Sequence, residues 1–152
     1  MAHRMSDQEV RDFLTGTPAH TGKLATTRAD GRPHVAPVWF ALDLSTVSDA
    51  DPVGEIVFQT GADTLKGRSL RRDGRAALCV DDERPPFAFV TIEGTVTISE
   101  DPDELVHWGT VIGGRYMGAD QAAAFGVRNG VPGELVVRLR PTTIVALAEV
   151  SD

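Results

Sequence analysis

The stretch GKLATTRADGRPHVAPVWFALD, residues 22–43, contains two extended runs with a tight turn between them. Residues 22–28 and 32–43 form the runs, and Asp30-Gly31 lies at the turn. An Asp-Gly pair between such runs is a strong β-hairpin signal, because glycine readily adopts the positive φ that a tight hairpin turn requires. The stretch therefore predicts two antiparallel strands that are neighbours in one sheet.

The other extended segments are typical of the same architecture. Residues 55–61 alternate apolar and polar side chains, and residues 76–80, AALCV, form an apolar run that predicts a buried strand. Residues 87–100 are long and rich in β-branched side chains; in the last segment, 133–150, Pro141 must lie at an edge or a bulge. Six or seven strands in all predict a mainly β fold with short helices, built as an antiparallel barrel.

Short helices are expected between these strands. Ser6-Asp7-Gln8-Glu9 has the S-x-x-E form of a capping box, and Asp101-Pro102 has the cap and first-turn proline of a second helix start. Gly113-Gly114 is expected to end that second helix, while Gly67 makes a further short helix less favourable by about 1 kcal/mol relative to alanine. The expected helices cover residues 7–14, 62–72, 101–113 and 119–125.

The composition fits one domain over residues 1–152, with 41% hydrophobic and 24% charged residues. No apolar run approaches the ~20 residues of a membrane span, and the first ten residues lack the apolar centre of a secretory signal. The single cysteine, Cys79, excludes an intrachain disulfide, and we expect it to be a small buried hydrophobe. We therefore expect a cytoplasmic protein. A net charge of −7 argues against a protein that coats nucleic acid.

Several common kinds of site have no support in the sequence. The four histidines have neither an i, i+4 partner nor a cysteine companion, so no metal site is expected. There is no G-x-S-x-G nucleophile elbow and no Walker loop, and residues 113–118 do not match G-x-G-x-x-G. What remains is a concentration of positive charge.

Residues 64–80 read TLKGRSLRRDGRAALCV, and ten of them, residues 66–75, contain five basic side chains and only one acidic side chain. The chain as a whole is acidic. The preceding strand ends at Thr60-Gly61, so the start of the expected helix brings free backbone N–H groups and side-chain donors together. A helix N-terminus with Lys and Arg is suited to binding a phosphate. The residues predicted for this phosphate site are Thr60, Thr64, Lys66 and Arg68. For Arg71, Arg72 and Arg75, ordinary surface ion pairing is the favoured interpretation.

The order of these segments resembles a known family. DGRPHVAPVWF (30–40), K-x-R-x-L-R-R-D-x-R-A (66–76) and V-x-I-E-G-T-V (90–96) are similar to segments of pyridoxamine 5′-phosphate oxidase-like split β-barrel proteins. The resemblance is to their actinobacterial branch of deazaflavin-dependent oxidoreductases, and it covers about residues 22–147. It implies a split antiparallel β-barrel of the FMN-binding type.

The resemblance also implies a homodimer with two cofactor sites at the interface, each built from both chains. Lys66 and Arg68 are the positions implied to hold the cofactor phosphate, with Thr60 and Thr64 adding hydroxyls. The strand Pro37-Val38-Trp39 would lie along the ring system, with its backbone at the polar edge of the ring. Pro86-Phe87-Ala88 would approach the same ring from the other subunit.

Two cofactors are compatible with the resemblance: coenzyme F420, an 8-hydroxy-5-deazaflavin, and flavin mononucleotide (FMN). FMN needs one phosphate neutralised, whereas F420 carries a phosphodiester and a polyglutamate tail that Arg71, Arg72 and Arg75 could meet. The charge excess therefore favours F420. The C-terminal segment, VRLRPTTIVALAEV, has no counterpart of the Trp and Arg substrate clamp of the oxidase proper, so vitamin B6 oxidation is not expected.

The resulting hypothesis is an oxidoreductase in which reduced F420 transfers a hydride to an electron-poor small-molecule acceptor. Tyr116, His107 or water would supply the proton, with Tyr116 on a loop hinged at Gly113-Gly114. The alternatives are an FMN-dependent oxidoreductase of the same fold and a non-catalytic deazaflavin-binding carrier. The sequence does not specify the acceptor.

Overall fold

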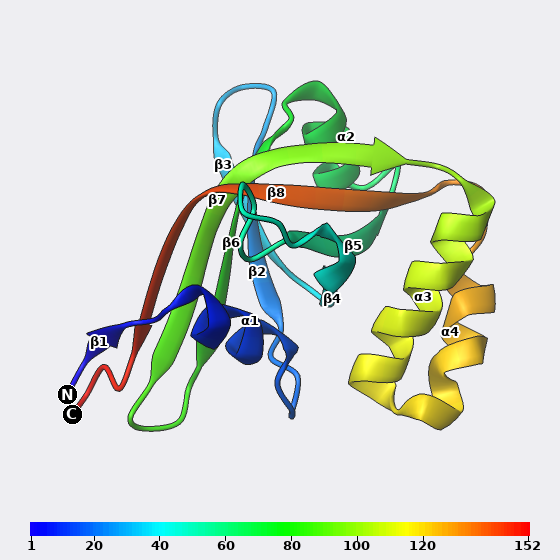
Figure 1. Ribbon diagram of the computed structural model, residues 1–152. Helices are drawn as coiled ribbons and strands as arrows, with labels where there is room; N and C mark the ends of the chain where they lie inside the picture. Colours follow the sequence, from blue (N-terminus) through cyan, green and yellow to red (C-terminus); the bar gives the residue numbers. More distant parts are fainter.

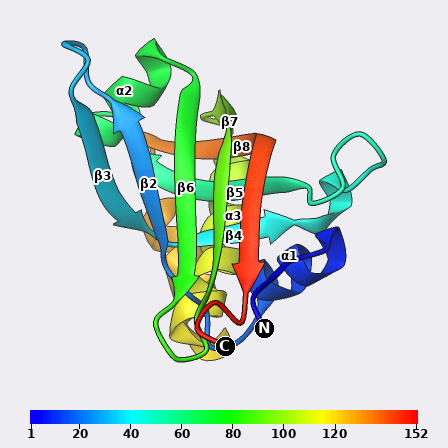
Figure 2. The same ribbon diagram turned by 90° about the vertical axis from the view of Figure 1, so that its left-hand side faces the viewer.

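The hairpin predicted from residues 22–43 forms, and it belongs to one strongly curled antiparallel sheet (Figures 1 and 2). The computed structural model describes all of residues 1–152. The strands are β1 (His3–Arg4), β2 (Gly22–Thr27), β3 (Pro33–Val38), β4 (Phe40–Asp43), β5 (Glu55–Gly61), β6 (Arg75–Asp82), β7 (Ala88–Ser99) and β8 (Glu134–Ala148). The helices are α1 (Asp7–Thr15), α2 (Leu65–Arg72), α3 (Pro102–Met117) and α4 (Ala122–Asn129), with 3₁₀ turns at Leu44–Thr46 and Ala119–Gln121.

The strands follow the order β3-β2-β6-β7-β8-β5-β4, and β1 pairs with β8. β3 and β4 are therefore the two edges of the sheet, although they follow one another in the chain. The predicted single strand over 32–43 is wrong in this respect, because it divides at Trp39: β3 pairs with β2, whereas β4 pairs with β5. The barrel is split at this corner, and the mainly β, split antiparallel fold predicted from the sequence is confirmed.

The long strands β7 and β8 run through both halves of the curled sheet. Their register shifts where Glu93 lies opposite Thr143 and Gly94 lies opposite Pro141, which leaves Thr142 as the extra residue of a bulge. A side chain on Gly94 would clash with the carbonyl oxygen of Arg140, so the bulge depends on glycine there. The predicted bulge position of Pro141 is confirmed.

The predicted starts of α1 and α3 are confirmed, whereas α2 begins at Leu65 and α4 at Ala122, both later than predicted. The predicted ends of α3 and α4 are wrong, because α3 continues to Met117 and α4 to Asn129. Ser6 caps α1 by accepting a hydrogen bond from the Glu9 N–H (3.2 Å), and the Glu9 carboxylate accepts one from the Ser6 N–H (2.7 Å). Helix α3 does not stop at Gly113-Gly114 and continues to Met117. A side chain on Gly113 would clash with Phe125, so this glycine permits the close packing of α3 against α4.

The strand predicted to be fully buried over residues 76–80 is buried on one face only. Ala76, Leu78 and Val80 lie in the core of the curled sheet, whereas Ala77 and Cys79 are half-exposed on its outer face. The prediction of a buried Cys79 is therefore wrong. The small apolar residues gave the pattern of an interior strand, although their outer face is open in the single chain.

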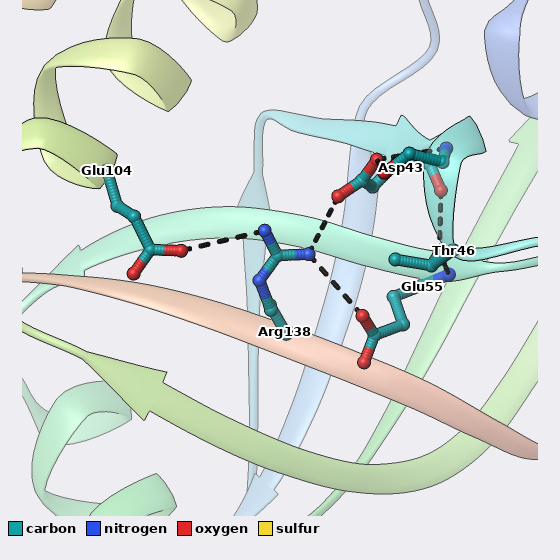
Figure 3. A network of polar contacts seen from close by, with 6 residues as sticks. Asp43, Thr46, Glu55, Glu104 and Arg138 are labelled. Atoms are coloured by element: carbon teal, nitrogen blue, oxygen red, sulfur yellow. Dashed lines mark hydrogen bonds and ion pairs between the residues drawn. The ribbon is translucent and has the colours of Figure 1, made fainter.

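Helix α3 packs against the sheet through a second apolar cluster formed by Ala41, Val57, Leu105, Trp108, Ile112 and Val136. A polar network fixes its first turn (Figure 3). Arg138 of β8 pairs with Asp43 (2.9 Å), Glu55 (3.4 Å) and Glu104 of α3 (3.7 Å). The Arg138 guanidinium also lies 5.4 Å from the centroid of the Trp108 ring. No helix reaches the length and apolar character that crossing a membrane would require.

The two sheet edges differ in how they are covered. β3 carries Pro33 and Pro37, which have no N–H group to offer to a further strand. At β4, the Phe40 N–H donates to the Tyr116 hydroxyl (3.3 Å), and the Phe40 carbonyl accepts from Arg115 Nη1 (2.7 Å). The last turn of α3 therefore satisfies the backbone at the start of this edge.

Candidate functional site: a cavity at the N-terminus of α2

A cavity of about 380 Å³ lies between the β3–β4 corner, the end of β5, the start of α2 and the α3–α4 pair. It is lined by Pro37, Val38, Trp39, Gln59, Thr60, Gly61, Thr64, Lys66, Ile112 and Asn129. Six of these residues were predicted from the sequence for cofactor binding: Pro37, Val38, Trp39, Thr60, Thr64 and Lys66. The chain therefore brings three of the four predicted phosphate residues and the predicted ring segment Pro37-Val38-Trp39 into one cavity.

A larger hollow of about 500 Å³ is open on the outer face of the sheet and includes Arg75 and Glu93 in its lining. None of the predicted cofactor-binding residues lines that hollow, and one of its lining residues, Glu93, is acidic. We place the candidate site in the smaller cavity because its lining combines residues predicted to bind a phosphate with residues predicted to lie along a ring.

Thr64 organises the start of α2. Its Oγ1 accepts a hydrogen bond from the Gly67 N–H (3.0 Å) and donates to the carbonyl of Gly61 (2.8 Å). The Thr60 hydroxyl lies 3.0 Å from Thr64 Oγ1, and it must donate there because the Thr64 proton is already engaged. The N–H groups of Leu65 and Lys66 take part in no hydrogen bond. Thr64 is thus a helix cap that leaves two first-turn donors free.

Gly67 explains why a weak helix former stands in this short helix. A Cβ at this position would clash with the carbonyl oxygen of Gly61 at the end of β5. Glycine therefore lets α2 begin directly against the strand end, and this contact sets the free N–H groups beside the cavity. The local cost of glycine in a helix, about 1 kcal/mol, is offset by this packing.

Lys66 is the one charged side chain in the lining of the cavity. It makes no ion pair with any carboxylate. No acid lines the cavity in a chain of net charge −7. A half-buried lysine, two free backbone N–H groups and the positive end of α2 are together suited to binding one anionic group.

The other cations of the basic segment do not line this cavity. Arg68 turns its Nη1 to the carbonyl of Asp63 (2.6 Å). Arg71 pairs with Glu100 (2.7 Å), Arg75 pairs with Asp73 (3.0 Å), and Arg72 donates to the carbonyl of Thr27. The favoured interpretation of Arg71 and Arg75 as surface ion pairs agrees with these contacts. The phosphate role predicted for Arg68 stays a prediction.

The remaining predicted residues, Pro86, Phe87 and Ala88, lie at the turn between β6 and β7. Figures 1 and 2 show this turn at the opposite end of the sheet from α2. Phe87 is exposed with a φ of 60°, a conformation that costs a non-glycine residue energy. Residues near the C-terminus hold the turn, since the Val150 N–H donates to Phe87 (3.1 Å) and the Ser151 N–H to Pro86 (3.0 Å).

Residues 6–148 match the family model described as pyridoxamine 5′-phosphate oxidase. The chain belongs to this family. The match spans the hairpin, the α2 cavity and both long strands.

Solved structures similar to this member of the pyridoxamine 5′-phosphate oxidase family include three informative ones. A conserved hypothetical protein from Mycobacterium tuberculosis is 28% identical with a TM-score of 0.76, covering 95% of this chain and 86% of that one. An F420 reductase is 26% identical with a TM-score of 0.64, covering 88% of this chain and 94% of the reductase. An FAD-binding protein from Mesorhizobium loti, 18% identical with a TM-score of 0.65 and 97% coverage of both chains, shares the fold.

The two predicted proton donors lie outside the lining of the cavity. The Tyr116 hydroxyl donates to the carbonyl of His20 (2.7 Å) and accepts from Phe40, and burial raises its pKa above the ordinary tyrosine value. The ring of His107 packs edge-on against Trp108 at 4.9 Å. Neither side chain is one of the cavity residues, and a role for either in proton transfer remains a prediction.

Four lining residues were missed by the sequence interpretation: Gln59, Gly61, Ile112 and Asn129. Gln59 and Gly61 flank the predicted Thr60, so the end of the strand was itself a signal for them. Ile112 and Asn129 come from α3 and α4, far along the chain. Only the docking of these helices beside the strand corner brings them to the cavity, and no local pattern indicates it.

Proposed function

We propose that the protein is an oxidoreductase that binds reduced coenzyme F420 in this cavity and transfers a hydride to an electron-poor small-molecule acceptor. The observation that carries the proposal is Lys66, an unpaired cation beside free N–H groups of a helix in an acid-free cavity. Family membership supports an oxidoreductase, and the similarity to an F420 reductase at 26% identity supports the deazaflavin.

The chain's own residues would bind and orient the cofactor. Lys66 and the first turn of α2 would hold its phosphate, and Pro37-Val38-Trp39 would lie along its ring, where the Trp39 N–H takes part in no hydrogen bond and offers a backbone donor. When bound, the deazaflavin supplies a hydride from C5. The lining contains no carboxylate and no histidine, so the proton that completes the product would come from water. The contribution of the protein would be orientation and exclusion of solvent.

We further propose that the site is completed in a homodimer formed through the outer face of the sheet. That face carries Val35 (66% exposed), Val145 (52% exposed) and the half-exposed Ala77 and Cys79. A two-fold axis across the strands would bring the β6–β7 turn of one copy, with Phe87 at its tip, to the α2 end of the other. Such an arrangement agrees with the position of this turn at the far end of the single chain.

The dimer is tested by sedimentation equilibrium of the wild type and of Ala77→Glu, which places a charge at the centre of the outer face. The wild type is expected to sediment as a dimer and the variant as a folded monomer with at least tenfold weaker cofactor binding. A wild type that is monomeric at cofactor saturation would contradict the dimer.

FMN is the second candidate cofactor, and a specific observation favours it. Only one free cation lines the cavity, which is enough for one phosphate, whereas Arg71, Arg72 and Arg75 are engaged elsewhere. A tail-binding role for these arginines would require their present contacts to break. The cavity lining contains no carboxylate and no histidine, which is also compatible with a non-catalytic deazaflavin carrier.

One experiment separates the three functions. The purified protein is titrated with F420 and with FMN, following cofactor fluorescence, and reduced cofactor is then supplied with a panel of enones and quinones. Tighter binding of F420 and turnover of at least one acceptor are expected. Tighter binding of FMN would overturn the deazaflavin assignment, and binding of F420 without turnover of any acceptor would point to the carrier.

A further inference from the structure

Trp39 is the only aromatic residue that lines the cavity, and it stands at the corner where the barrel is split. Trp39 is 38% exposed, although it lies between the strand corner and the α3–α4 pair. An indole exposed inside a cavity leaves apolar surface in contact with water, and a flat ligand that covers it gains both burial and stacking.

Tyr116 holds the Trp39 indole in a fixed orientation. The two rings are nearly parallel, with an interplanar angle of 5° and centroids 5.1 Å apart. The Tyr116 hydroxyl is itself fixed, because it donates to His20 and accepts from Phe40. Both hydrogen-bonding functions of this phenol are therefore used to position its ring behind Trp39.

Two further side chains complete the support. Phe125 of α4 meets Trp39 at 5.7 Å with a tilt of 55°. Arg115 lies 5.3 Å from the Tyr116 ring and donates to the carbonyls of Phe40 (2.7 Å) and Leu14 (2.5 Å). Arg115 has no carboxylate partner, so its hydrogen bonds tie α1, the strand corner and α3 together beneath the aromatic pair.

We propose that the Trp39 indole is the surface on which the acceptor stacks, that the acceptor is a flat conjugated ring, and that Tyr116 is the positioning residue for Trp39. This inference rests on the proposed function. It assigns Trp39 to the acceptor because the cofactor is expected along the backbone of β3, whereas the indole turns toward α3 and α4 and contacts residues of both. The Asn129 side chain, which makes no hydrogen bond, lies in the same lining for a polar edge of the ring.

Stacking can be observed without turnover, because the chain has only two tryptophans. Trp108→Phe leaves Trp39 as the single fluorescent indole; Trp108 is buried in the apolar cluster under α3 and does not line the cavity. This variant is titrated with 1,4-naphthoquinone as the flat probe and with 2-cyclohexenone as the non-aromatic probe, with free N-acetyltryptophanamide as the control for light absorption. Saturable quenching by the naphthoquinone alone is expected, and linear quenching equal to that of the free indole would overturn the proposal.

Kinetics of the loaded enzyme test the assignment to the acceptor. Trp39→Leu is expected to raise KM for 1,4-naphthoquinone about tenfold or more, to change KM for 2-cyclohexenone less than threefold and to leave cofactor Kd within threefold. Trp39→Phe keeps a smaller ring and should lie between the two. Phe13→Leu, which removes an aromatic side chain outside the cavity, is the matched control and should behave as the wild type. An unchanged KM, or a loss of cofactor affinity in place of the KM effect, would overturn the acceptor assignment.

Tyr116→Phe separates positioning from proton donation. A positioning role predicts a higher KM for the naphthoquinone, lower Trp39 quenching and an unchanged pH profile of kcat. A fall in kcat with an altered pH profile at unchanged KM would overturn that role. The proposed function has its own test, because it is wrong if the wild type binds neither F420 nor FMN. In that case, the quenching of Trp39 fluorescence still decides whether a flat ring stacks on the indole.

Discussion

Arg138 and Lys66 are both half-buried cations, but their surroundings are opposite. Arg138 has three carboxylates within ion-pair distance and the face of Trp108 beside it, and it ties β8, β4, β5 and α3 together (Figure 3). Lys66 has no carboxylate partner and borders a cavity with free N–H groups. A cation whose charge is balanced within the fold stabilises the fold, whereas one left unbalanced beside a cavity indicates a ligand.

The basic segment shows both kinds within a few residues. Arg71 and Arg75 resemble Arg138, because each has an acidic partner, and only Lys66 faces the cavity. The density of charge in the sequence therefore pointed to the segment that borders the candidate cavity, but it overstated how many cations line that cavity. Substitutions that affect one kind of cation and not the other test this distinction.

The largest effect is expected for Gly67→Ala, because it disturbs the packing of α2, which carries Lys66, against the end of β5. The new Cβ would clash with the Gly61 carbonyl and push α2 away from the end of β5. The free energy of unfolding should fall by about 1–3 kcal/mol, and cofactor binding should weaken at least tenfold. Urea denaturation and fluorescence titration measure the two effects. Gly74→Ala is the control, since the nearest atom to its new Cβ is 3.7 Å away; wild-type behaviour of Gly67→Ala would contradict the packing account.

Lys66→Ala should weaken binding of the cofactor, and of inorganic phosphate as its simplest anionic fragment, about tenfold or more. The loss of one charge-assisted hydrogen bond of ~1.5–3 kcal/mol accounts for this range. Stability should change by less than ~0.5 kcal/mol, because Lys66 has no partner to lose. Arg75→Ala, which removes an exposed paired cation, is the matched control and should bind as the wild type. Equal affinities of the two variants would place the anion elsewhere.

Arg138→Met should have the reverse effect. Removal of this guanidinium leaves Asp43, Glu55 and Glu104 without their shared cation, and we expect unfolding to become easier by about 1–2 kcal/mol. Cofactor affinity should stay within threefold of the wild type, as measured by the same titration. Arg140→Met breaks a single exposed pair with Asp51 and should cost less than ~0.5 kcal/mol. If the two arginine variants are equally stable, the network is not a stabilising centre.

The smallest effect is expected from acid. Burial raises the pKa of Asp43, but hydrogen bonds from Ser45 and Arg138 outweigh burial and leave this pKa below its ordinary value of 3.8. The unfolded chain therefore binds a proton more readily, and the stabilisation is present above about pH 4 and is lost as the pH falls through the lowered value. Urea midpoints from pH 7 to pH 3 should fall more steeply in this range for the wild type than for Arg138→Met.

The sequence predicted local structure well where a short motif determines it. The capping box at Ser6, the Asp-Gly turn and the bulge at Pro141 each depend on a few adjacent residues, and each is present. The split at Trp39 was missed because residues 38–42, VWFAL, form an unbroken apolar run while the strand changes its neighbour from β2 to β5. The choice of neighbour is a long-range property that a periodic pattern does not contain.

The candidate site was predictable to the same extent. The helix start at Thr64 and the cation at Lys66 are adjacent in the sequence, so their chemistry could be inferred before the fold was known. Asn129 and Ile112 reach the cavity only because glycines allow α3 and α4 to pack closely. The sequence predicted a helix end at Gly113 because glycine is a weak helix former. In the structure, Gly113 lies within α3, and its lack of a side chain makes room for Phe125 of α4.

The treatment of the two sheet edges limits how this chain can self-associate. Prolines on β3 and the capped backbone of β4 leave little for an extra strand to pair with, so growth of a continuous intermolecular sheet is disfavoured. Replacing Pro33 and Pro37 with valine would restore two donors on an open border, and fibrous aggregation would then compete with native assembly. The prolines therefore disfavour association through the β3 edge of the sheet.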